Sequence, residues 1–168
     1  MSGDAIVDEP RVGVLRRAGD WSDPAAGRLV LDYDARFLRR KRLETEDGLG
    51  VIVDLAETVS VEDGDAFEAE DGRLFAVVAA PEPLLRVRGD LVRLAWHIGN
   101  RHTPCQVGDG HLLIREDHVL AKMLAGLGAQ VEAVEAPFRP EGGAYGHGRT
   151  HGHDHGHSHD PHHHGHNH

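Results

Sequence analysis

Histidine is the residue type in this sequence with the clearest capacity for chemistry, and its distribution is uneven. Of 15 histidines, four precede residue 140 and the others crowd the end of the chain, mostly alternating with Gly, Asp or Ser. Neutral imidazole is a good ligand for nickel, copper, zinc and cobalt. The candidate metal ligands of this tail are His147, His151, His153, His155, His157, His159, His162, His163, His164, His166 and His168.

Small spacer residues would let a flexible chain fold several imidazole rings around one ion. At three to five ligands each, the tail would hold roughly two to four ions, with Asp154 and Asp160 as further oxygen donors. Binding should weaken below a pH of about 6.5, where imidazole takes up a proton. An engineered purification tag is the alternative, but the longest histidine run here is three residues. Imidazole ligands alone do not select one metal over another. Their affinity follows the general order of the divalent transition metals, in which copper binds most tightly.

Two of the remaining histidines are candidate ligands in the body of the protein. His102 falls in the loop Gly99–Pro104, where the residues alone favour an ordinary solvated side chain. Cys105 could join it as a ligand, although a small buried residue is the more usual role for such a cysteine. His118 is expected at the start of a helix, where the dipole disfavours a positive imidazolium and leaves a ring able to bind metal. A packing role for His118 is equally compatible with that position.

The other two histidines and the acidic residues give no further site. His97 and His111 have no partner at ligand spacing and are interpreted as structural or surface residues. The pair Glu116-Asp117 is typical of a helix start rather than of an acid/base dyad. There is no P-loop, HExxH helix, GxSxG elbow or GxGxxG turn, so the sequence does not predict an enzyme.

Composition excludes several classes of protein. A formal charge of −10 argues against nucleic-acid binding, which requires a basic face. One cysteine excludes an internal disulfide framework. The acidic N-terminus lacks the apolar region of a secretory signal, and the apolar stretch Leu74–Ala80 is too short to span a bilayer. We therefore expect a cytoplasmic protein that binds neither nucleic acid nor membrane.

The first 80 residues predict a small all-β domain. Short apolar runs are bounded by Asp-Gly turns, and no helical period of useful length occurs. The expected strands are Arg11–Arg17, Arg28–Tyr33, Leu49–Leu55 and Arg73–Ala79. The segment Ala80–Pro83 is predicted to be a linker, because two prolines in three residues should not continue a sheet ladder.

Residues 83–140 predict a second domain with the order βαββαβ, the ferredoxin-like arrangement of two helices on a four-stranded sheet. The chain is thus of the α+β class. The expected elements are a strand at Leu84–Arg88, a helix from Asp90 to Asn100, strands at Cys105–Val107 and His111–Ile114, a helix from Asp117 to Gly128, and a strand at Gln130–Val134. Residues 141–168 lack apolar content and are predicted to be disordered without a ligand.

Several of these segments resemble one known family. The segments are Gly99-Asn100-Arg101-His102, Asp117-His118-Val119-Leu120, Met123-Leu124, Leu127-Gly128, Pro137-Phe138 and Pro140–Gly146, followed by the histidine-rich end. They are similar to the UreE-type urease accessory proteins, which are nickel metallochaperones. The likeness is specific from about Leu94 to Arg149. It implies an N-terminal domain of peptide-binding type and a metal-binding C-terminal domain through which the protein forms a homodimer.

The resemblance also implies roles for particular residues. The family's histidine after Asn-Arg is a nickel ligand shared by two subunits, a role that falls on His102 here and replaces the solvated-loop interpretation. The tail histidines are expected to complete or extend that site. Some members have His-Asp-His at the second helix where this chain has Glu116-Asp117-His118, so His118 is the weaker candidate. The implied cargo is Ni²⁺, with Zn²⁺ or Cu²⁺ as further ions that could bind, and the implied partners are the apo-urease complex and its maturation GTPase.

Two competing functions remain at this stage. One is a prolyl isomerase with a histidine-rich tail, which would need an aromatic-lined pocket, whereas the eight aromatic residues are dispersed. The other is a metal storage protein, which would bind metal without any dependence on His102. Whether Glu116 or Cys105 contributes a ligand is left open by the sequence.

Overall fold

The N-terminal part of the chain forms a six-stranded β-sheet. The computed structural model describes residues 8–142. Its first strands are β1 (Arg11–Arg16), β2 (Gly27–Leu31), β3 (Phe37–Glu44), β4 (Gly50–Ser60), β5 (Ala66–Ala69) and β6 (Leu74–Ala79). They lie in the order β2-β6-β5-β1-β4-β3 around a core that includes Val12, Leu29, Val53 and Phe75. No helix occurs among the described residues before Leu91, so the predicted β character of this region is confirmed.

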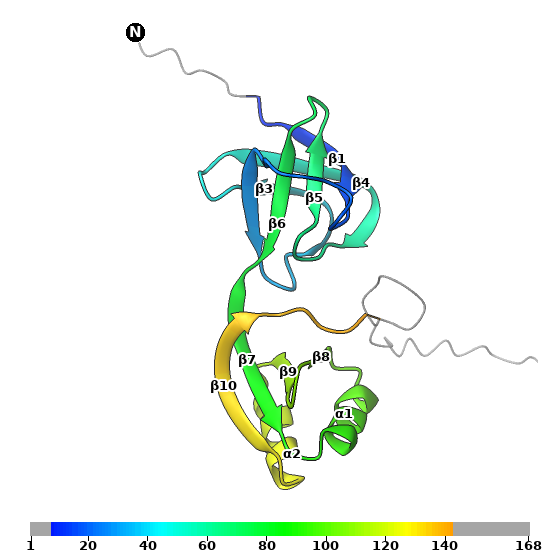
Figure 1. Ribbon diagram of the computed structural model, residues 1–168, viewed down its shortest axis with the longest axis vertical. Coiled ribbons are helices and arrows are strands. Elements are labelled where there is room, and N and C mark those ends of the chain that lie inside the picture. Colours follow the sequence, from blue (N-terminus) through cyan, green and yellow to red (C-terminus); the bar gives the residue numbers. More distant parts are fainter. Residues whose placement is uncertain (1–7, 143–168) are drawn as a thin grey trace, which may run out of the picture.

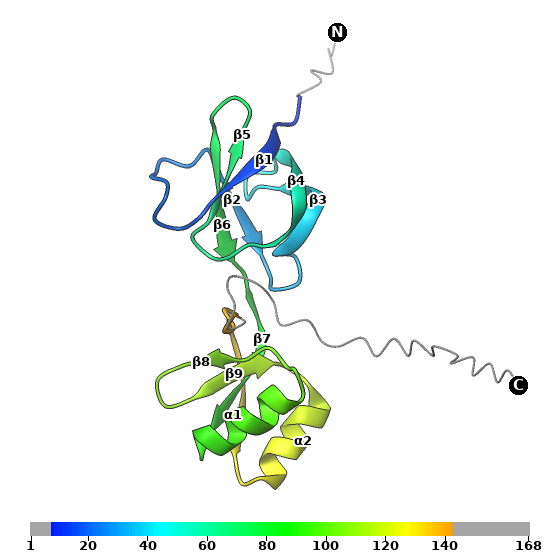
Figure 2. The ribbon, with the colours of Figure 1, turned by 90° about the vertical axis from the view of Figure 1, so that its right-hand side faces the viewer.

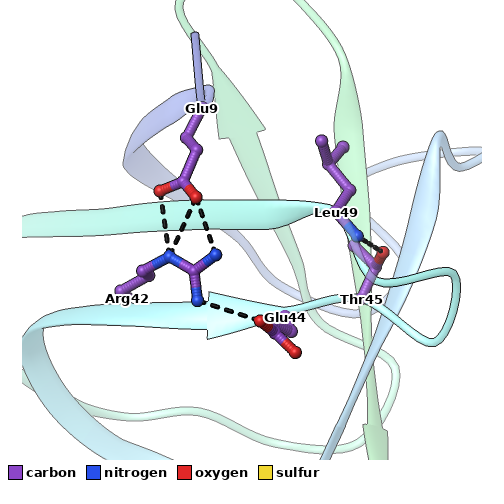
Figure 3. A network of polar contacts seen from close by, with 5 residues as sticks. All are labelled: Glu9, Arg42, Glu44, Thr45 and Leu49. Carbon is purple, nitrogen blue, oxygen red and sulfur yellow. Dashed lines mark hydrogen bonds and ion pairs between the residues drawn. The ribbon is translucent and has the colours of Figure 1, made fainter. Parts of the chain in front are cut away.

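Two of these strands, β3 and β5, were not predicted from the sequence. β3 is a sheet edge that buries only Leu38 and Leu43; its other side chains are charged except for the exposed Phe37. Figure 3 shows how these charges are paired: the Arg42 guanidinium donates to both Glu9 carboxylate oxygens and to Glu44. The neighbouring turn is closed by Thr45, whose Oγ1 accepts from the Leu49 amide at 3.1 Å. Charged edge strands resist pairing with other chains, and they lack the apolar alternation on which a sequence-based prediction rests.

The predicted linker at Ala80–Pro83 is wrong. Strand β7 (Pro81–Arg88) begins at the first of the two prolines and pairs with β10 along its whole length. Pro81 and Pro83 precede the stretch Leu84–Val87 in which β7 also pairs with β9. A proline is tolerated there because its missing N–H is not required by a neighbour on that side. The chain therefore runs from one sheet into the other with only Ala80 between strands (Figure 1).

The second sheet has four strands in the order β10-β7-β9-β8. Its other elements are α1 (Leu91–Asn100), β8 (Gln106–Val107), β9 (Leu112–Arg115), α2 (His118–Gly126) and β10 (Gln130–Pro137), so every element predicted for this region is present. Figure 2 shows the two helices side by side on one face of the sheet. Leu94 and Ile98 of α1 and Leu120 and Leu124 of α2 form the core beneath them. Among the described residues, the longest helix has ten residues and none is long and apolar enough to cross a membrane.

A small cluster joins the two sheets. Tyr33, which follows β2, packs against Leu84, Leu113 and Phe138, and its ring meets that of Phe138 edge-on at a centroid distance of 5.3 Å. The Tyr33 amide also donates to the Glu82 carboxylate at 2.9 Å. Phe138 is fully buried although it lies just beyond β10. The end of the second sheet is thus packed against the first.

Two arginines reinforce this junction. The buried guanidinium of Arg36 donates to the carbonyl oxygens of Leu31 and Phe138. Burial lowers the pKa of Arg36 from its usual value, with Glu82 and Asp63 opposing that effect. Arg115, at the end of β9, lies over the Tyr33 ring and forms an ion pair with Asp34 at 2.9 Å.

Candidate metal centre

The first candidate ligand, His102, closes helix α1 in an unusual backbone conformation. Its φ angle is 56°, and it is the only non-glycine residue with positive φ in the described part of the chain. The His102 amide donates to the Gly99 carbonyl at 3.0 Å, and the Thr103 amide donates to Ile98 at 3.4 Å. These two bonds form a Schellman motif, whose left-handed position is usually occupied by glycine.

A histidine at this position carries an energetic cost. A non-glycine residue in the left-handed region costs about 1–2 kcal/mol, because its Cβ crowds the following carbonyl. Glycine would end the helix without that cost. The exposed imidazole of His102 therefore occupies a backbone position that glycine would occupy at lower cost.

The second candidate, His118, is the first residue of α2. Asp117 caps this helix, and its Oδ1 accepts from the amides of Val119 at 2.8 Å and Leu120 at 3.0 Å. The cap fixes the direction of the helix start and leaves the His118 side chain exposed. The predicted position of His118 at a helix N-terminus is confirmed.

The structure brings these two histidines to one place. The end of α1 faces the start of α2, and an open hollow of about 610 Å³ lies between them. His102, Arg115, Glu116, Asp117 and His118 line it, with Pro83, Thr103, Pro104 and Leu120 completing the wall. Two imidazoles that are 16 positions apart in sequence thus share one solvent-accessible surface.

The ligand set in this hollow is incomplete. Within residues 8–142, no group of three or more His, Cys, Asp or Glu side chains is arranged to hold a metal ion. A transition-metal site usually needs three or four donors. Any tight site at His102 would therefore require donors from outside the described residues or from a second molecule.

Cys105 is a poor candidate for one of those donors. Its side chain packs against the core beneath the helices, and burial, with a smaller effect from Glu141, raises the pKa of the thiol from 9.0 to about 11. A metal binds the thiolate and not the thiol. This supports the packing role over the ligand role that the sequence had left open.

The remaining histidines of the described chain lie apart from the hollow. His97 is half-buried and contacts the Trp96 ring edge-on at 5.0 Å. His111 Nδ1 lies 3.0 Å from the Asp109 carbonyl oxygen in the β8–β9 turn. Both positions agree with their interpretation as structural or surface residues. The tail histidines from His147 to His168 lie outside the described residues.

Sequence reasoning overlooked an apolar surface on the same helices. Val92 and Trp96 of α1 and Val119 of α2 are 85%, 62% and 62% exposed. Val92 and Trp96 are four residues apart and therefore share one face of α1. A helical-wheel projection of α1 would have revealed this exposed apolar face, because Leu94 and Ile98 already account for the buried face of the helix. Val119 follows His118 directly, so part of this apolar surface adjoins the hollow.

Comparison with known proteins covers both parts of the chain. Residues 9–80 match the family model described as UreE urease accessory protein, N-terminal domain, and residues 82–168 match that of the C-terminal domain. The urease accessory protein UreE of Cereibacter sphaeroides is 60% identical over 145 residues, which are 86% of this chain and 80% of that protein. Its counterpart in Ruegeria pomeroyi is 59% identical over 145 residues, covering 86% of this chain and 97% of the relative. The protein of the same name from Paracoccus denitrificans is 62% identical over 127 residues, which are 76% of this chain and 82% of that protein.

Proposed function

Because this chain belongs to the UreE family of urease accessory proteins, we propose that it is a nickel carrier that delivers Ni²⁺ to apo-urease during urease maturation. The family consists of accessory proteins and not of enzymes, which removes the prolyl isomerase from consideration. Nickel is in this view the cargo of the protein. Zn²⁺ and Cu²⁺ are ions that the same imidazoles would also bind.

The observation that carries the proposal is the incomplete ligand set around His102. Two exposed imidazoles share a hollow, yet the described residues supply no third donor to a metal group. A two-fold axis near His102 would double the ligands without any further sequence. A site completed in this way stays open to exchange, which suits a protein that must release its metal.

The exposed apolar surface supports a homodimer formed through the C-terminal domain. Val92 and Trp96 lie on α1, the helix that ends at His102, and Val119 adjoins His118. Large apolar side chains that are exposed in the single chain are typical of protein interfaces. A second copy packed on this face would cover them and bring a second His102 close to the first.

The remaining parts of the chain have proposed roles in the same process. The histidine-rich tail extends the site and collects further ions, and the N-terminal sheet binds a protein partner. The apo-urease complex and the maturation GTPase are the proposed partners, in the cytoplasm, and the GTPase supplies the nucleotide chemistry for which this chain has no motif. The C-terminal unit is ferredoxin-like, an assignment supported by its strand order. The boundaries near residues 80 and 140 stay predictions.

Nickel titration by calorimetry tests the proposal. The full chain, its His102→Ala variant, and both proteins shortened after Tyr145 are compared. Alanine is chosen because it keeps the Cβ and so the same backbone cost at φ 56°. We expect one tight ion per dimer in both full and shortened chains, several-fold fewer ions in the shortened one, and loss of the tight site with His102→Ala.

A different result would favour metal storage. If the shortened chain has no tight site, or if His102→Ala leaves tight binding unchanged, the tail alone carries the metal. Transfer of Ni²⁺ to apo-urease would then also be independent of His102.

A further inference from the structure

Strand β3 carries the longest run of basic residues in the chain, at an edge of the N-terminal sheet. Arg39, Arg40, Lys41 and Arg42 are consecutive and exposed, whereas the whole sequence has a formal charge of −10. β3 pairs with β4 on one side, and no strand of the described chain pairs with its other side. The sheet therefore ends in a basic edge on a protein whose overall charge is negative.

The backbone of this edge is available for hydrogen bonding over most of its length. In an edge strand, alternate N–H and C=O groups point away from the one neighbouring strand. Within the described residues, the backbone of Leu38–Leu43 forms no hydrogen bond other than those to β4. The edge closes only beyond β3, where the Glu46 amide donates to the Arg28 carbonyl at 3.0 Å. An extended segment of another chain can therefore add to β3 as a further strand.

Two of the four basic side chains have no acidic partner in the described part of the chain. The Arg39 guanidinium donates to the Leu55 carbonyl at 3.4 Å, and Lys41 forms no ion pair with a described residue. By contrast, Arg40 and Arg42 are held by carboxylates of the same domain. Arg39 and Lys41 thus leave two positive charges on the edge that no described carboxylate neutralises.

One contact within the protein shows how this strand binds a carboxylate. Both carboxylate oxygens of Glu9, in the segment before β1, accept from the Arg42 guanidinium at 2.7–3.0 Å (Figure 3). The two residues are 33 positions apart, so the strand binds an acidic side chain from a separate stretch of chain. Arginine favours such pairing because its N–H groups match the two oxygens of a carboxylate. Carboxylates on an added strand would pair with Arg39 and Lys41 across the new ladder.

We propose that the outer edge of β3 binds an extended acidic segment of a partner protein by strand addition. Main-chain hydrogen bonds supply affinity, and cross-strand pairs of carboxylates with Arg39 and Lys41 select an acidic sequence. The inference rests on the part of the proposed function in which the N-terminal sheet binds a protein partner. It adds which surface of that sheet is used and the chemistry of the segment that it binds.

The same charges argue against two other occupants of this edge. A second copy of β3 would place basic side chains opposite one another, and like charges facing each other across two strands are destabilising. Nucleic acid is disfavoured because the carboxylates of Glu9, Glu44 and Asp54 stand among the basic side chains and would repel phosphate. An acidic polypeptide strand uses both the free backbone groups and the unneutralised charges.

Peptide binding to the full chain tests the proposal. The probe is an eight-residue peptide in which valine alternates with glutamate, and the same peptide with lysine in place of glutamate is the charge control. Calorimetry measures the affinities. Hydrogen exchange measures protection of the amides of Leu38–Leu43, part of which an added strand would cover. A single-stranded oligonucleotide is titrated as the competing class of ligand.

Two double variants separate the edge from the total charge of the protein. Arg39→Glu/Lys41→Glu reverses the two unneutralised charges and leaves the ion pairs of the strand intact. Arg73→Glu/Arg88→Glu is the matched control, because it makes the same change of charge at exposed positions outside β3. The exposed ion pairs that this control removes contribute little to stability.

We expect the glutamate peptide to protect amides of β3 in the natural chain and the lysine peptide not to bind. Arg39→Glu/Lys41→Glu should bind the glutamate peptide at least about fourfold more weakly, since two opposite-charge pairs become like-charge pairs. The control variant should bind it as the natural chain does.

Four results would overturn the proposal: no binding of the glutamate peptide, equal weakening in both double variants, binding without protection of β3, or binding of the oligonucleotide alone. Each of them leaves the nickel role untouched. The nickel titration of His102→Ala decides that role separately, because His102 belongs to the other domain and takes no part in peptide binding at β3.

Discussion

His102 and Gly128 occupy the same position in two copies of one helix-ending motif. After α1, the amides of His102 and Thr103 donate to Gly99 and Ile98; after α2, those of Gly128 and Ala129 donate to Ala125 and Leu124. The φ angles are 56° and 86°. One helix thus ends with the residue that this conformation favours, and the other ends with an imidazole beside the hollow.

Replacing His102 by glycine should separate stability from metal binding. We expect His102→Gly to raise the free energy of unfolding of the metal-free protein by up to about 1 kcal/mol, because the left-handed conformation no longer crowds a Cβ. The same variant should lose the tight nickel site. Urea unfolding and nickel titration of one preparation measure both, and a marked loss of stability would contradict this account of the motif.

Gly128→Ala is the converse change in the matching motif. It should lower the free energy of unfolding by about 1–2 kcal/mol, since alanine at φ 86° carries the full backbone cost. Apart from the glycine itself and its two chain neighbours, no described atom lies within 4 Å of the added Cβ, so no clash with another part of the fold contributes to this loss. Nickel affinity should stay unchanged, and urea unfolding beside a nickel titration checks both points. Weakened nickel binding would show that the end of α2 also shapes the metal site.

Trp96→Glu should convert the proposed dimer to monomers. The side chain is 62% exposed in the single chain, so folding should be retained while a charge enters the apolar surface of α1. Sedimentation measures the mass, and the tight nickel site should weaken with the dimer. Val107→Glu is the control, because Val107 is similarly exposed at 58% but belongs to β8 and not to either helix. If the Trp96→Glu variant still forms dimers that are as stable as those of the natural chain, the dimer interface does not involve this surface of α1.

Cys105 should make stability depend on pH in the alkaline range. Its pKa is raised from 9.0 to about 11 by burial, so the folded state disfavours the thiolate. The contribution is fully present below pH 9 and is lost as pH rises through about 11, because the unfolded thiol ionises first. The free energy of unfolding should therefore fall more steeply between pH 8 and pH 11 in the natural chain than in Cys105→Ala. Parallel pH profiles for the two proteins would contradict the burial of this thiol.

The secondary-structure elements could be predicted from the sequence where the local residue pattern agrees with the packing of the folded chain. In the C-terminal part, helical spacing of Leu94 and Ile98, the cap at Asp117 and the stop at Gly128 all point to the elements that the structure contains. In the N-terminal part, apolar runs between Asp-Gly turns predicted four strands but missed β3 and β5. β3 is largely charged because it lies at an edge, and its charges are paired with residues as distant as Glu9.

The candidate site could be predicted only in part. The residue types pointed to metal chemistry, and the family resemblance selected His102 from its motif. From the residues alone a solvated loop histidine was preferred, because nothing local shows that His102 and His118 line one hollow. The positive φ of His102 was also not visible, since a histidine gives no sequence signal for a left-handed conformation.

The sequence by itself determined the chemistry of this protein: many imidazoles, one thiol, and no motif for nucleotide or acyl chemistry. These properties depend on residue type alone. Only the tertiary structure decided that the end of α1 meets the start of α2, that two prolines begin a strand, and that Arg36, Gln106 and Cys105 bind the backbone of the residues just after β10. Those contacts join residues up to 102 positions apart, and such distant pairings follow from how the two sheets pack, which no local pattern in the sequence encodes.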